Sequence, residues 1–123
     1  MIKTLLLIGF GGGMGSILRY LTGFTIQKFY GSTFPLATFS VNVIGCFIFG
    51  LFLSYFSKNT ENSEELRFLL LTGFCGGYTT FSTFSAENFQ LIENGNFFIP
   101  VLNILASLIF GLIAVFLGIQ IAK

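Results

Sequence analysis

An uncharged polar stretch interrupts one of the apolar segments of this chain of 123 residues. Residues 73–85 read GFCGGYTTFSTFS and contain three glycines and five serine or threonine hydroxyls. Backbone polar groups at membrane depth must be satisfied by protein or by a water-filled cavity, and broken helices there commonly bind ions. We therefore expect a helix that breaks near residues 76–80, next to an ion site.

Two phenylalanines follow the glycines in this stretch. Phe81 and Phe84 are three residues apart, so they share one face of any helix that restarts there. Packing in the core is the ordinary role of such a pair. An aromatic ring also presents a positive edge, against which an anion can lie, and the hydroxyls of Ser82 and Thr83 are donors nearby.

Asn42 lies inside another apolar segment, TFSVNVIGCFIFG. Thr38 stands one helical turn before it and Gly45 follows three residues later, so one face carries a hydroxyl, an amide and a gap. An amide in hydrocarbon either bridges helices or offers its N–H donors to a desolvated anion. The segment by itself leaves both roles open.

Arg19 stands near the end of the first apolar segment. Its side chain either snorkels to the interface or attracts anions at the mouth of a cavity, with Glu87 as a possible ion-pair partner. Carbonyl groups freed by the break at residues 76–80 are suited to a hard cation such as Na⁺, because such cations take oxygen ligands.

The composition indicates an integral membrane protein. Hydrophobic residues make up 54% of the chain and charged residues 9%, with a mean hydropathy of +0.86. The net charge of +1 excludes a nucleic-acid-binding surface. The chain contains no His and no Asp, and we find no nucleophile–base pair, so we expect no enzyme activity.

The apolar segments predict an all-α fold with one transmembrane domain over residues 1–123. Four segments are long enough to cross a hydrocarbon core of about 30 Å. They cover approximately residues 4–24, 34–56, 66–92 and 98–122. In the first, Gly9 with Gly13 and Gly11 with Gly15 have the four-residue spacing that lets helix backbones approach closely.

Three motifs, GGGMGSILRY, TFSVNVIGCFIFG and GFCGGYTTFSTFS, occur in this order along the chain. Together they resemble the Fluc (CrcB) fluoride channels, and the resemblance covers essentially the whole chain. It implies a passive, fluoride-selective channel in the bacterial cytoplasmic (inner) membrane that lets toxic F⁻ leave the cell. It further implies an antiparallel, dual-topology homodimer with two pores and a structural Na⁺ at the dimer centre.

The resemblance also implies a role for individual residues. Asn42 would be the pore amide, Phe81 and Phe84 the pore phenylalanines, and Arg19 the vestibule arginine. Backbone oxygens of Gly76 and Thr79 would hold the Na⁺. The remaining polar residues assigned to the anion path are Ser82, Thr83, Thr38 and Ser107. One departure stands out, because Asn103 occupies a position where many relatives carry Tyr.

Two other classes of membrane protein have a similar size. A proton-coupled multidrug exporter needs a titratable carboxylate within a span, and here the first span has none while Glu87 and Glu93 come late in the third. A non-transporting assembly subunit would explain the glycines. It would not explain why Asn42, Phe81 and Phe84 occur together with the hydroxyls.

Overall fold

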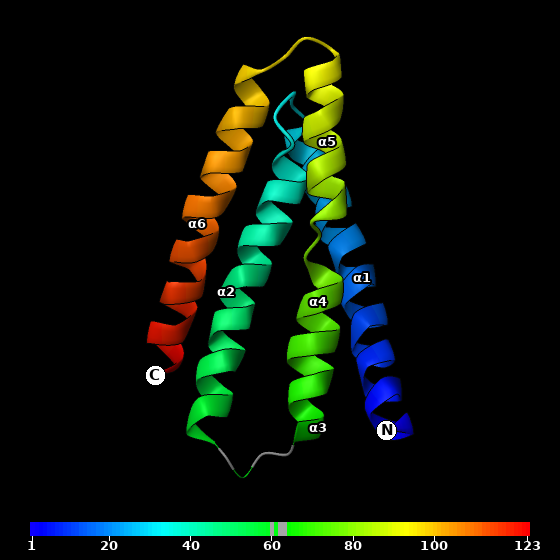
Figure 1. Cartoon of the computed structure of the whole chain (residues 1–123), viewed down its shortest axis with the longest axis vertical. Coiled ribbons are helices and arrows are strands. Elements are labelled where there is room, and N and C mark those ends of the chain that lie inside the picture. The colour runs from blue at the N-terminus through cyan, green and yellow to red at the C-terminus, as the bar shows by residue number, and fades with distance from the viewer. Residues whose placement is uncertain (60, 62–63) are drawn as a thin grey trace.

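The structure, a computed structural model, describes residues 1–59, 61 and 64–123, and this part of the chain is helical without strands. Figure 1 shows the helices side by side, with both termini toward the same end of the molecule. The helical elements are α1 (Ile2–Tyr30), α2 (Leu36–Lys58), α3 (Glu64–Arg67), the π-helix η1 (Phe68–Cys75), α4 (Gly76–Tyr78), α5 (Ser82–Glu93) and α6 (Phe98–Ala122).

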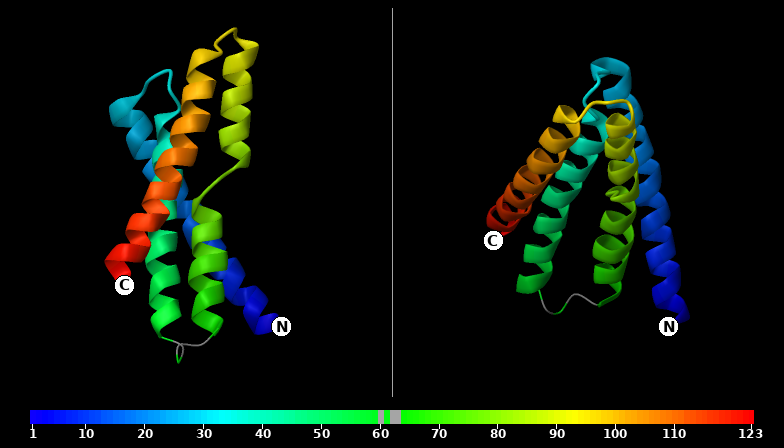
Figure 2. Two further views of the ribbon diagram at one scale, coloured as in Figure 1. Left: turned by 60° about the vertical axis from the view of Figure 1, so that its left-hand side comes forward. Right: turned by 45° about the horizontal axis from the view of Figure 1, so that its top comes forward.

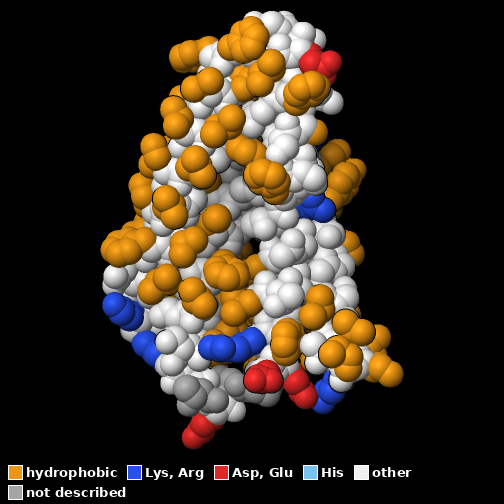
Figure 3. All heavy atoms as spheres, viewed as in Figure 1, with side chains coloured by type: hydrophobic (Ala, Val, Ile, Leu, Met, Phe, Trp, Pro, Cys, Tyr) orange, Lys and Arg blue, Asp and Glu red, His pale blue; other side chains and the backbone are white. Residues whose placement is uncertain are grey.

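Within the described residues, three helices are long and apolar enough to cross a membrane, namely α1, α2 and α6. Apolar side chains are spread over the face seen in Figure 3, and most of its charged side chains gather toward one end. An apolar exterior is stable only when lipid or another protein surface covers it. The third apolar segment, predicted over residues 66–92, is not one helix but is divided among α3, η1, α4 and α5.

The break in this segment comes at its expected place. Gly76 keeps α-helical dihedral angles (φ −63°, ψ −36°), and the chain becomes extended at Thr79 (φ −83°, ψ 158°). The predicted break near residues 76–80 is therefore confirmed, and it falls at the end of that range. As Figure 2 shows, α5 is displaced sideways from α4, so the two parts of the segment do not share one axis.

Glycines hold α1 against η1 and α4. A Cβ added at Gly11 would overlap the carbonyl oxygen of Leu69, and one at Gly15 would overlap that of Phe74. The pair Gly11 and Gly15 thus has the predicted packing role. The pair Gly9 and Gly13 does not have it within the described chain, since a Cβ at either would contact nothing.

A second glycine contact joins α2 to α6. Added Cβ atoms at Gly50 and Gly118 would overlap the carbonyl oxygens of Val115 and Phe47 respectively. Small residues at such crossings bring backbones close and increase van der Waals contact, which drives helix association in lipid. The molecule therefore contains two tightly packed helix pairs, and the break between α4 and α5 faces both α1 and α2.

Candidate functional site

The side chain of Asn42 holds the extended backbone at the break. Its Nδ2 donates to the carbonyl oxygen of Thr80 at 3.0 Å, and the Thr80 N–H donates to Asn42 Oδ1 at 2.8 Å. Unpaired backbone groups at membrane depth are costly, so this reciprocal pair stabilises the broken conformation. Nδ2 carries two hydrogens, and the bond to Thr80 uses one of them.

Two carbonyl groups beside the break lose the donors that a continuous helix would supply. The Thr80 N–H, which an α-helix would direct to Gly76, instead bonds Asn42. The Thr83 N–H, which would be directed to the carbonyl of Thr79, bonds Thr80 Oγ1 at 3.2 Å. Within the described residues, the carbonyl oxygens of Gly76 and Thr79 are therefore released from their helical donors.

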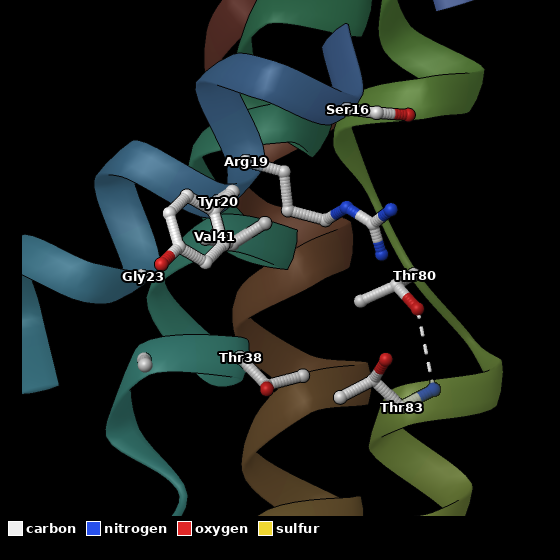
Figure 4. Close-up of a pocket in the computed structure, with 9 residues that line it drawn as sticks. Ser16, Arg19, Tyr20, Gly23, Thr38, Val41, Thr80 and Thr83 are labelled. Carbon is white, nitrogen blue, oxygen red and sulfur yellow. Dashed lines mark hydrogen bonds between the residues drawn. The ribbon is translucent and has the colours of Figure 1, made fainter. Parts of the chain in front are cut away.

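A cavity of about 300 Å³ lies between α1, the start of α2 and the break. Its polar lining includes the guanidinium of Arg19, which extends toward the hydroxyl of Thr80 in Figure 4. The Thr38 side chain projects from α2 and that of Thr83 from α5. The cavity is lined by Ser16, Arg19, Tyr20, Gly23, Ala37, Thr38, Val41, Thr80 and Thr83.

The cavity contains one cationic side chain and several neutral donors, and a carboxylate is held at its edge. The Thr38 hydroxyl donates to Oε1 of Glu87 on α5. In the part of the chain that the structure describes, Glu87 and Arg19 form no ion pair, so the pairing considered from the sequence does not occur. Glu87 is hydrogen-bonded by Thr38 rather than by Arg19, so among the described residues the guanidinium of Arg19 has no carboxylate partner.

The rings of Phe81 and Phe84 lie near one another at the start of α5. Their centroids are 6.1 Å apart and their planes are inclined by 39°. The predicted shared face is therefore present. Phe81 is 79% exposed, however, and lies outside the lining of the cavity. One side of this aromatic pair is therefore exposed at the protein surface, where lipid or another protein chain can contact it.

Comparison with known proteins agrees with these features. A family model described as CrcB-like protein, Camphor Resistance (CrcB), matches residues 6–119. The chain belongs to the CrcB family. A protein of Flavobacterium psychrophilum named fluoride-specific ion channel FluC is 49% identical over 122 residues, which are 99% of this chain and 98% of that protein.

Other relatives in the family carry the same name. The one from Azobacteroides pseudotrichonymphae is 48% identical and covers 96% of this chain and 94% of its own length. The one from Geobacter sulfurreducens is 44% identical, with 99% and 98% covered. Family membership and the apolar helices make this CrcB protein a multi-pass protein of the bacterial inner membrane.

The structure distributes the predicted site residues of this CrcB protein over three places. Arg19, Thr38 and Thr83 lie at the cavity. Asn42, with the backbone of Gly76 and Thr79, lies at the break. The rings of Phe81 and Phe84 flank the start of α5, where the Ser82 hydroxyl lies 3.5 Å from Thr80 Oγ1.

Ser107 is the predicted residue that lies apart from the others. It donates from Oγ to Asn103 Oδ1 at 3.1 Å, and Asn103 Nδ2 donates to Asn88 Oδ1 at 3.0 Å. Asn88 was not predicted as a site residue. A signal was present in the sequence, since Asn88 lies four residues after Phe84 and seven after Phe81, which places it on the same helical face.

Proposed function

We propose that the chain is a passive, fluoride-selective ion channel through which F⁻ leaves the bacterial cytoplasm. The observation that carries this proposal is the near full-length similarity, at 49% identity, to a protein named fluoride-specific ion channel. The local chemistry agrees with it. A cation-lined cavity leads to hydroxyl and amide donors without further formal positive charge, which suits an ion that must enter favourably and still leave.

The proposed path begins at the cavity. The guanidinium of Arg19 raises the local concentration of anions there, because a charge in a low-dielectric cleft focuses its field. The hydroxyl of Thr83 then replaces water around F⁻, together with the second N–H of Asn42. The Thr38 hydroxyl has a single hydrogen, which it donates to Glu87, so it binds F⁻ only when that hydrogen bond opens. Neutral donors bind more weakly than a second cation would, so the ion can move on.

Beyond the break, the positive edges of the Phe81 and Phe84 rings carry the ion past apolar surface. Discrimination against Cl⁻ follows from size and hydrogen-bond strength. A narrow path lined by closely spaced donors compensates a small ion for its lost water better than a larger one. Ser82 supplies a further hydroxyl on α5. Ser107 on α6 belongs to the path through its hydrogen bond to Asn103, which uses its one hydroxyl hydrogen.

A complete path in this proposal requires a second copy of the chain. The ring of Phe81 is 79% exposed, which leaves the aromatic pair covered on one side only. We propose four membrane-spanning segments, counting the broken one, and an antiparallel homodimer whose partner surface encloses the rings. Two such surfaces in a symmetric dimer give two pores.

We further propose a structural Na⁺ at the centre of this dimer, held by the carbonyl oxygens of Gly76 and Thr79 from both copies. The redirected N–H groups of Thr80 and Thr83 support this assignment, because they leave those two oxygens without their helical donors. Such oxygens are the ligands that a hard cation takes. When bound, the ion supplies a fixed positive field beside the anion paths.

The decisive experiment is anion efflux from liposomes that contain the purified protein, with F⁻ and Cl⁻ measured by ion-selective electrodes. The proposal predicts rapid F⁻ efflux without Cl⁻ efflux and without need of a proton gradient. Efflux that requires a proton gradient would favour an exporter instead. Absence of F⁻ efflux from folded, dimeric protein would favour an assembly subunit.

A further inference from the structure

Two linked side-chain hydrogen bonds, one buried and one part-buried, connect Ser107 and Asn103 of α6 to Asn88 of α5. Ser107 donates to Asn103, and Asn103 donates to Asn88, at 3.1 and 3.0 Å. Asn103 is fully buried and Asn88 is 5% exposed. Two amides and a hydroxyl therefore lie together between two helices, away from bulk water.

The direction of these bonds leaves donors rather than acceptors unused. Both amide oxygens accept a hydrogen bond, one from Ser107 and one from Asn103. Within the described residues, Nδ2 of Asn88 has no hydrogen-bond partner. A buried polar atom without a partner is rare in native proteins and usually marks a bound ion, a bound water or a functional site.

The position of this donor connects it to the aromatic pair. Phe81, Phe84 and Asn88 are separated by three and four residues, so they follow one another along a single face at the start of α5. Asn88 lies one helical turn beyond Phe84. An ion that has passed the ring edges next meets a neutral amide with two free hydrogens.

We propose that Nδ2 of Asn88 is a further anion-binding donor on the fluoride path, a step after the phenylalanines. The inference rests on the proposed function.

The orientation of the two amides matters for this role. If the side-chain O and N of both Asn88 and Asn103 exchanged places, the hydrogen bonds of Asn103 to its two neighbours would be preserved, but Asn88 would have its oxygen where its Nδ2 now lies. A bound anion favours the orientation that presents N–H, because it interacts only with donors.

Asn103 and Ser107 act in this proposal as positioning residues. Asn103 fixes the Asn88 oxygen, and Ser107 fixes Asn103 in turn, so the buried Asn88 N–H groups point away from these two partners. A short amide at position 103 allows the hydrogen bond to Asn88 that orients its Nδ2.

The test compares F⁻ efflux from liposomes containing Asn88→Ser and Asn88→Ala, both verified as dimers by size-exclusion chromatography. Serine keeps a hydroxyl donor, whereas alanine has none at similar size. We expect Asn88→Ala to conduct about tenfold more slowly than Asn88→Ser, since hydrogen bonds to an ionic partner are the stronger class. Equal rates would mean that the amide holds only water, and would overturn the proposal.

A second variant places an acceptor where the donor was. Asn88→Asp keeps an oxygen for Asn103 but replaces Nδ2, so F⁻ efflux should fall by at least about tenfold, because a carboxylate repels the anion. Asn96→Asp is the matched control. The Asn96 Oδ1 accepts the Ile99 N–H in the α5–α6 connection, an interaction that a carboxylate preserves, so its efflux should equal that of wild type.

The results separate this inference from the proposed function. If wild-type protein shows no selective F⁻ efflux, the proposed function fails. If wild type conducts F⁻ selectively and Asn88→Asp conducts equally well, only the role of Asn88 fails. If Asn88→Asp does not form a dimer, the serine and alanine pair decides the question without it.

Discussion

Asn42 and Thr80, 38 positions apart in the chain, form a reciprocal pair in which each donates to and accepts from the other, at 3.0 and 2.8 Å. This pair keeps the chain extended between α4 and α5. It also diverts the Thr80 N–H from the carbonyl of Gly76. The Asn42 side chain on α2 thereby pairs the backbone N–H and carbonyl of Thr80 at the break. It also leaves the carbonyl oxygen of Gly76 without its helical donor.

Replacing Asn42 with Asp should abolish F⁻ efflux. The substitution removes the donor to the Thr80 carbonyl and places a negative charge next to the anion path, and the lost hydrogen bond should lower the free energy of unfolding by about 1–3 kcal/mol. Efflux assays and thermal unfolding measure the two effects. Asn59→Asp is the control, because exposed Asn59 makes the same type of bond, to Tyr55, at 3.0 Å. Normal efflux by Asn42→Asp would exclude the assignment.

Replacing Phe81 or Phe84 with Ile should reduce F⁻ efflux while the protein stays dimeric. Isoleucine keeps apolar bulk but has no ring edge, so the loss should appear in conduction rather than in assembly. Phe89→Ile provides the control, since this phenylalanine is 60% exposed on the same helix. Unchanged efflux in both pore variants would mean that the rings only pack.

Replacing Arg19 with Gln should slow F⁻ efflux most strongly at low salt. The electrostatic attraction between the Arg19 guanidinium and F⁻ acts at a distance and is screened by salt. The screening length falls from about 30 Å at 0.01 M to about 3 Å at 1 M ionic strength. The ratio of wild-type to variant rates should therefore approach one as salt is raised. Lys28→Gln removes an equal charge from the last turn of α1, outside the cavity lining. An equal effect of that variant would point to general surface charge instead.

Replacing Gly15 with Ala should lower the melting temperature, because the added methyl overlaps the Phe74 carbonyl oxygen and must push α1 away from η1. Gly13→Ala is the contrasting variant. A Cβ there contacts nothing, and alanine favours an isolated helix over glycine by about 1 kcal/mol. Thermal unfolding in detergent should therefore show opposite shifts. A matching decrease in both would show that Gly13 packs against a partner.

Removing Na⁺ should destabilise the dimer if the carbonyls of Gly76 and Thr79 hold it. A ligand that binds only the folded state stabilises it in proportion to the logarithm of its concentration. The melting temperature should accordingly fall when Na⁺ is exchanged for a large organic cation at constant ionic strength. A melting temperature independent of Na⁺ would remove the ion from the proposal.

Much of the site was predictable because its signals are local. The composition of residues 73–85 located the break, and three-residue spacing placed Phe81 and Phe84 on one face. Both follow from helix periodicity and from the cost of unsatisfied backbone in lipid. The four-residue spacing of Gly11 and Gly15 likewise predicted a close helix contact.

Other features depended on which helices lie next to each other. The sequence alone could not choose between bridging and anion binding for Asn42. It also could not decide which cation Glu87 would pair with, whereas in the structure Glu87 accepts a hydrogen bond from Thr38. It placed the break near residues 76–80, and the structure narrows this to the end of the range, since Gly76 stays helical and Thr79 is extended. Such contacts join residues tens of positions apart, and no local pattern encodes the helix crossing that creates them.

The sequence by itself thus determined the membrane environment, the helical class, the site of the break and the residue types available there. Tertiary structure alone decided where the donors point. It turned the Asn42 amide onto Thr80, gathered Arg19 and Thr38 around one cavity, and left the buried Nδ2 of Asn88 without a hydrogen-bond partner among the described residues. The reason is physical, because composition and periodicity act along one helix, whereas hydrogen-bond partners are set by packing between helices.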